Sequence, residues 1–234
     1  AALHLPLACT NIRAPVSSHV TCSDATLTTA GVVESRVSRD LSLALYHHSE
    51  HKGAYTRLDW NQTDWCLQPW KQTKLPDVLC AAVRAADWKC CAQYDFSIVN
   101  HVNIQEGHAT LSALEFHCDE GDRRMRVLNG IDSRVFLGAW AKGRSSSAQL
   151  NNVIRRCAGR CILFSLVLAQ FWLDTKHNPA DDPSRRVPVR APTRATGVAA
   201  DLARPESNPS RRAKAPLRFS KKLLLEIFAG CAGL

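Results

Sequence analysis

The sequence has no apolar run close to 18 residues, no apolar leader at its start and no Cys-x-x-Cys pair among its ten cysteines. A membrane-spanning helix needs about 20 mostly apolar residues, and a secretory signal needs an apolar core. We therefore expect no membrane anchor and an intracellular location, in the cytoplasm or the nucleus. Without a recognisable zinc spacing, the cysteines are expected to be free thiols in a reducing compartment.

Acidic residues are scarce in one part of the chain. Residues 183–222 hold 11 Lys and Arg against 2 Asp and Glu, whereas residues 1–182 hold 19 against 18, and the whole chain has a net charge of +9. The near-neutral part is long enough for one well-packed domain. The basic part predicts either a polyanionic partner, most simply a nucleic acid, or a solvated linker.

The hydrophobic pattern predicts an α/β domain built on a mixed sheet. Strands are expected at residues 19–25, 30–35, 97–104, 124–132 and 165–174, and helices at 106–118, 133–141 and 148–164. The block 36–95 is expected to be a Trp-rich insertion packed on this domain, with helical spacing at 76–88. Its tryptophans are expected in a core, although aromatic rings can also stack on bases.

The sequence also predicts separate segments before and after the domain. Residues 1–18 are expected to form a connector, and residues 19–186 the domain itself. Residues 187–220 are rich in Pro and Arg and have few large apolar side chains. Because such a composition buries too little surface to become ordered, we predict a disordered basic linker there. Residues 221–234 are expected to begin a truncated following domain.

Four acidic side chains lie at the ends of the expected elements. Asp24 ends the first strand, Glu106 opens the helix after the third, Asp132 ends the fourth and Asp181 follows the last. Hydrolysis of a phosphodiester with two metal ions needs several carboxylates around a pair of Mg²⁺ ions. Each acid alone is more simply explained as a helix cap or a turn residue. The set of four predicts a metal site.

The residues around these acids resemble a known family. The four segments are TCSDAT, HVNIQEGHATLSAL, NGIDSRVFLGAWAKGRSSS and HNPADDPSRR. In this order they are similar to the motifs of the ribonuclease H domain of DIRS-type (tyrosine-recombinase) retrotransposons, over about residues 15–186 apart from the middle. The resemblance implies a ribonuclease H-like mixed sheet flanked by helices. It also implies that Asp24, Glu106, Asp132 and Asp181 are catalytic ligands of two Mg²⁺ ions, with Mn²⁺ as a substitute and Asp182 as the alternative to Asp181.

The activity implied by this resemblance is Mg²⁺-dependent endonucleolytic cleavage of the RNA strand of RNA–DNA hybrids, within a reverse-transcription polyprotein. The alternative is a degenerate module of the same fold that only binds nucleic acid or has a structural role. Lys142, Arg144 and Ser145, in the loop after the third motif, are expected to contact phosphates of the substrate. A solvated turn is the alternative there.

Some features depart from the family or extend beyond it. Gly107 follows Glu106 and weakens the helix start. His177 is the nearest candidate for a histidine that the family often has before its last Asp. The final segment LLLEIFAGCAGL resembles the first motif of S-adenosylmethionine-dependent methyltransferases, which DIRS-type elements often carry after ribonuclease H. A methyltransferase fragment is thus a third interpretation, and it predicts binding of S-adenosylmethionine.

Overall fold

The computed structural model describes residues 11–51 and 75–205. Within these ranges no helix has both the length and the apolar character needed to cross a bilayer. The seven cysteines of the same ranges form no disulfide, in agreement with the expected thiols.

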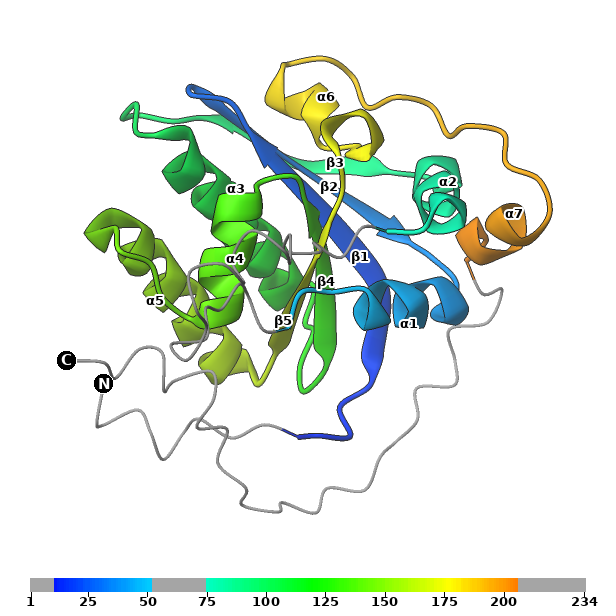
Figure 1. The fold of residues 1–234 in the computed structure, drawn as a ribbon, viewed down its shortest axis with the longest axis horizontal. Coiled ribbons are helices and arrows are strands. Elements are labelled where there is room, and N and C mark those ends of the chain that lie inside the picture. Colours follow the sequence, from blue (N-terminus) through cyan, green and yellow to red (C-terminus); the bar gives the residue numbers. More distant parts are fainter. Residues whose placement is uncertain (1–10, 52–74, 206–234) are drawn as a thin grey trace, which may run out of the picture.

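The centre of the molecule is one mixed sheet of five strands (Figure 1). The strands are β1 (Val16–Ala25), β2 (Thr29–Arg36), β3 (Lys89–Asp95), β4 (Arg126–Ile131) and β5 (Val167–Trp172), in the order β3-β2-β1-β4-β5. β2 is antiparallel to β1 and β3, whereas β1, β4 and β5 are parallel. The carboxyl ends of these three strands therefore meet at one edge. This mixed arrangement confirms the predicted α/β fold class with a mixed sheet.

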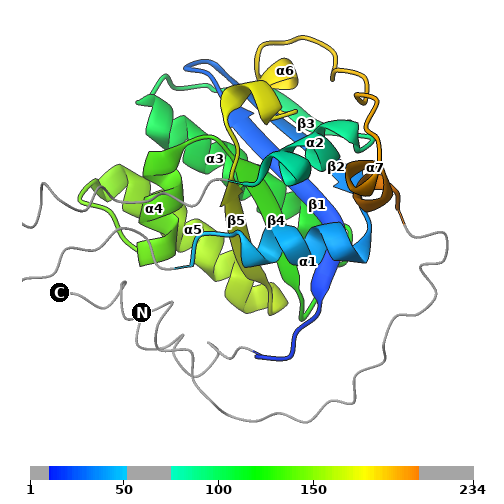
Figure 2. The same cartoon turned by 45° about the vertical axis from the view of Figure 1, so that its right-hand side comes forward.

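Helices cover both faces of the sheet (Figures 1 and 2). One layer consists of α3 (Val102–Asp119), α4 (Arg134–Lys142) and α5 (Ala148–Phe164), and the other of α1 (Arg39–His47), α2 (Asp77–Ala85) and α7 (Val198–Ala203). Each layer buries its own apolar cluster against the sheet. Two short helices, η2 (Thr175–His177) and α6 (Asp181–Ser184), follow β5.

Local signals explain why α4 and α5 lie where the sequence predicts. The hydroxyl groups of Ser133 and Ser147 accept hydrogen bonds from the backbone N–H groups three residues later and so cap the two helices. Gly143 ends α4 in the left-handed conformation, with φ of 68°. Because caps and periodicity agree here, both helices are confirmed.

The expected third strand is wrong. Residues 97–104 form a loop and the first turn of α3, and Ile98 and Val99 are exposed although their spacing mimics a strand. The sheet instead takes β3, which pairs with β2. Glu106 consequently lies inside α3, in its second turn, and does not open the helix.

The expected insertion is also smaller than predicted. α1, α2 and β3 all lie between residues 36 and 95, yet they pack in the domain's core or pair in its sheet. Trp88 is buried, and its Nε1 donates to the carbonyl O of Val83 at 2.7 Å, so its expected place in the core is confirmed. The other tryptophans of the segment lie outside the described residues.

Residues 187–205 are ordered against the domain, so the predicted disorder is wrong for them; we call them the C-terminal strap. Ala199 of α7 is buried in the same core as α1 and α2, and Ala203 of the same helix is also buried. Small alanines reach this core although the segment has few large apolar residues. Residues 206–220 of the predicted linker, and residues 221–234, lie outside the described residues.

Gly31 allows α6 to lie directly on β2. A Cβ atom at residue 31 would lie 2.4 Å from the backbone N of Ser184 and 2.9 Å from the carbonyl O of Ala180. Backbone atoms cannot rotate away, so Gly31→Ala is expected to displace α6 and lower the free energy of unfolding by about 3 kcal/mol. Urea denaturation measures this loss.

The matched control for this substitution is Gly159→Ala. Gly159 lies in α5, and a Cβ there meets no heavy atom within 4 Å. Alanine favours the helix over glycine, so this variant is expected to gain up to about 1 kcal/mol. Equal stabilities for the two variants would contradict the close approach of α6 to β2.

Candidate metal centre

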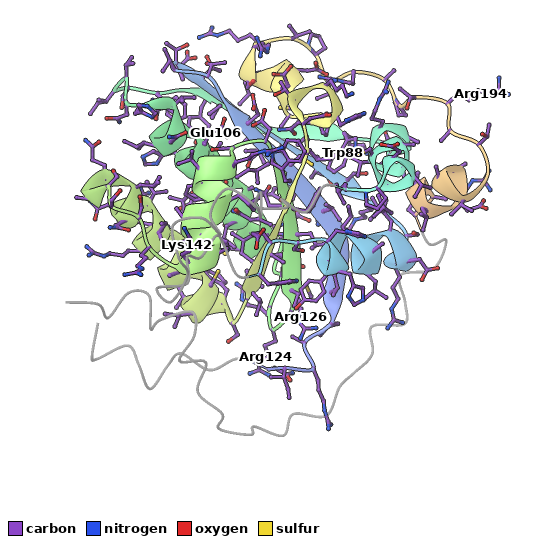
Figure 3. All side chains as sticks on the ribbon, in the orientation of Figure 1. Trp88, Glu106, Arg124, Arg126, Lys142 and Arg194 are labelled. Carbon is purple, nitrogen blue, oxygen red and sulfur yellow. The ribbon has the colours of Figure 1, made fainter. Side chains whose placement is uncertain are left out.

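Three of the four predicted acids converge at the carboxyl edge of the sheet. Asp24 lies near the end of β1, Asp132 directly follows β4, and Glu106 reaches the same edge from α3. One carboxylate oxygen from each lies within 4.8 Å of the others. Figure 3 labels Glu106 where α3 approaches the sheet. Residues separated by more than 100 positions thus share one cluster, which we call the carboxylate cluster.

Asp24 is buried and held from the side of α6. The hydroxyl of Ser184 donates a hydrogen bond to its Oδ2. Burial, followed by the charge of Asp132, raises the pKa of Asp24 to about 7, although the bond from Ser184 acts in the opposite direction. Asp24 therefore lies in a site where negative charge is costly unless a cation balances it.

Glu106 has one satisfied and one unsatisfied oxygen. Its Oε1 accepts a hydrogen bond from the backbone N–H of Ala25 at 3.3 Å, whereas its buried Oε2 has no partner. Burial, followed by the charges of Asp24 and Asp132, raises the pKa of Glu106 to about 9. Buried oxygens without a partner are rare in folded proteins and call for an explanation.

Gly107 accounts for the close position of α3. A Cβ at this residue would lie 2.7 Å from Cε2 of Phe136 and 3.1 Å from Cγ1 of Val153. Glycine costs helix propensity, but here it lets α4 and α5 pack closely on α3 beside Glu106.

Asp132 is oriented by Trp172, the last residue of β5, and by Thr175, the first residue of η2. Its backbone carbonyl accepts from Nε1 of Trp172 at 3.0 Å, and its Oδ2 accepts from the hydroxyl of Thr175 at 2.8 Å. The cap of α4 is the neighbouring Ser133. Asp132 is therefore not an ordinary N-cap, which was the structural alternative for this residue.

The neighbouring residues Asp181 and Asp182, at the start of α6, have different contacts. Both oxygens of Asp182 accept hydrogen bonds from Arg190. Asp181 lies outside the group of three. Burial and the charge of Asp132 are larger causes of the raised pKa of Asp24, but the charge of Asp181 also contributes, so Asp181 lies near the cluster. Its Oδ1 accepts from Nε of the exposed Arg185 at 2.8 Å. Of the two, Asp181 is the acid whose charge acts on the cluster.

The cluster suits a divalent cation with hard ligands. Its donors are carboxylate oxygens, which Mg²⁺ and Mn²⁺ prefer. A cation would satisfy the unpartnered Oε2 of Glu106 and would offset the burial and the mutual repulsion that together raise the pKa values of Asp24 and Glu106. The residues present therefore fit a bound divalent cation.

A second group of potential metal ligands lies near the start of β1, but its imidazoles already have hydrogen-bond partners. It contains His19, His117 and Asp122. Nδ1 of His117 pairs with Asp122 at 2.8 Å, and Nε2 of His19 pairs with Glu34 at 2.7 Å. Each imidazole already has a carboxylate partner, so these buried side chains are explained as a structural polar network.

The other predicted residues lie apart from the cluster. Lys142 and Arg144 are exposed at the far end of α4, about 13 Å of helix away from Asp132. The backbone N–H and carbonyl of Ser145 both pair with the side-chain amide of Asn151 at 2.7 Å. His177 pairs with Asp174. None of these contacts involves the carboxylate cluster.

Sequence reasoning missed Ser184 and Thr175, whose hydroxyls donate to Asp24 and Asp132. Ser184 had a signal, because it is the serine of the closing segment HNPADDPSRR. Thr175 had none, since its neighbourhood to Asp132 depends on the pairing of β5 with β4.

Comparisons with known proteins give a weak structural likeness. No protein-family model and no curated protein matches the chain. Among solved structures, it is similar to ribonuclease H1 from the halophilic archaeon Halobacterium salinarum, with a TM-score of 0.37 and 15% sequence identity, covering 70% of this chain and 91% of that chain.

Proposed function

We propose that the chain is a Mg²⁺-dependent endonuclease of the ribonuclease H type that cleaves the RNA strand of RNA–DNA hybrids. The proposed catalytic, metal-binding residues are Asp24, Glu106, Asp132 and Asp181. The observation that carries the proposal is the carboxylate cluster, in which three acids from distant segments meet and the buried Oε2 of Glu106 has no partner. Such a cluster is costly to maintain without a function that uses its charge.

Divalent ions bound there would supply an activated water and would stabilise negative charge on the leaving 3′ oxygen. The chain's own part is to hold its carboxylates in fixed orientations. Ser184 fixes Asp24, the N–H of Ala25 fixes Glu106, and Thr175 fixes Asp132. Ligands fixed in this way need no reorganisation when substrate binds.

We assign substrate contacts to Lys142, Arg144 and Ser145. Lys142 and Arg144 are exposed and basic, and a duplex is gripped mainly through its phosphates. Their distance from the cluster suits phosphates several nucleotides from the scissile bond. The retroelement context is part of the same proposal: an intracellular DIRS-type polyprotein, with a methyltransferase-like segment from residue 221.

The test is cleavage of a labelled substrate by the full chain. An RNA–DNA hybrid, a DNA duplex and an RNA duplex of one sequence are incubated with Mg²⁺ or with EDTA. We expect cleavage of the RNA strand in the hybrid alone, and none with EDTA. Binding of the hybrid without cleavage in Mg²⁺ or Mn²⁺ would contradict the enzyme and favour the degenerate binding module.

A further inference from the structure

Arg190, in the C-terminal strap, contacts both α6 and η2. Its Nε and Nη2 donate to the two carboxylate oxygens of Asp182 at 2.7 Å each, and its backbone N–H donates to Oδ2 at 2.8 Å. Its Nη1 donates to the carbonyl O of Lys176 at 2.9 Å, and its Nη2 lies 3.8 Å from Oδ2 of Asp181. Only the planar fork of a guanidinium can make this set of contacts, and lysine cannot replace it.

The grip on Asp182 is strong for a site near the surface. Both carboxylate oxygens of Asp182 accept hydrogen bonds from Arg190, so this carboxylate is fully engaged by one partner. The same short helix, α6, carries Asp181, and its Ser184 donates a hydrogen bond to Asp24. The helix that Arg190 holds therefore lies against the carboxylate cluster.

The strap is anchored to the domain at two points after Arg190. The backbone N–H of Thr193 donates to the carbonyl O of Arg84 in α2 at 2.9 Å. Further along, the carbonyl O of Leu202 accepts from the hydroxyl of Ser38 at 2.7 Å. Figure 1 shows the strap running from α6 across to α7, beside α2. Arg190 thus links α6 to the layer of α1, α2 and α7 through a segment that is itself anchored.

We propose that Arg190 is a positioning residue for the metal centre: by immobilising Asp182, it directs Asp181 towards Asp24. This inference rests on the proposed function, because it assigns Asp181 as a metal ligand. It also makes the strap part of the functional unit, although its composition predicts a linker. A unit ending at residue 186 would lack this contact.

The experiment measures Mn²⁺ binding to the full chain by calorimetry, below the melting temperature of each variant. Arg190→Ala, Arg190→Lys and Asp182→Asn each break the paired contact. Arg194→Ala is the matched control, because Arg194 is exposed on the same strap and lies far from Glu106 in Figure 3. We expect the first three to raise the Mn²⁺ dissociation constant about tenfold, and the control to leave it unchanged.

The lysine variant separates positioning from folding, because it keeps the charge and most of the stability but loses the fork. A wild-type dissociation constant in the folded Arg190→Lys and Asp182→Asn variants would overturn the role of Arg190. Wild-type chain that binds Mn²⁺ but cleaves no hybrid would overturn the proposed function and leave this test intact. Absence of Mn²⁺ binding by the wild-type chain would overturn both.

Discussion

Replacing Asp132 with asparagine is expected to lower the rate of hybrid cleavage about 1,000-fold, or about 4 kcal/mol of transition-state stabilisation. Asparagine has the same shape as aspartate and can keep the contacts with Thr175 and Trp172. It removes only the negative charge that the site presents to a divalent cation. Initial rates with labelled hybrid and saturating Mg²⁺ measure the effect.

The matched control for Asp132→Asn is Asp201→Asn, which removes the same charge from an exposed position on α7. Its rate is expected to stay within about twofold of the wild type. Full activity of Asp132→Asn would mean that the cluster is not the active site, or that the cleavage comes from another nuclease in the preparation. A parallel loss in both variants would point to a general effect of charge.

The elements that the sequence predicts correctly are those whose signals are local. β1, β4, β5 and α5 have apolar periods or terminal caps that need no knowledge of their neighbours. β3 has no such signal, because it is an edge strand with largely exposed or half-buried side chains. Its identity comes from pairing with β2. The alternation around Ile98 resembles a strand more closely, yet those side chains face solvent.

For the carboxylate cluster, too, the sequence predicts only the features that depend on local signals. The positions of Asp24 and Asp132 at the ends of parallel strands follow from their sequence context, so their convergence could be anticipated. The choice between Asp181 and Asp182 could not, because it depends on Arg190, eight residues after Asp182 in a segment whose composition indicates disorder. An ion pair between a turn and a strap leaves no periodic trace in a sequence.

The raised pKa of Glu106 has a consequence for stability. Between its ordinary value of 4.5 and about 9, the folded protein binds a proton that the unfolded chain releases. The stabilising contribution is therefore complete below pH 4.5 and is lost as the pH rises towards 9. At neutral pH the metal-free fold bears a cost on the order of 3 kcal/mol from this residue. A bound cation would offset that cost.

Glu106→Gln is thus expected to abolish cleavage while raising the stability of the metal-free protein by roughly 3 kcal/mol at pH 7. Glutamine can still accept from the N–H of Ala25, and its amide can donate to the neighbouring carboxylates. Thermal melts in EDTA should show the variant above the wild type at pH 7 and level with it at pH 4, and Mg²⁺ should stabilise the wild type more. Glu115→Gln, on the exposed side of the same helix and paired with Arg160, is the control and should change little. A variant that melts at or below the wild type at pH 7 would mean that Glu106 bears no electrostatic cost, and the case for a cation site would lose its physical basis.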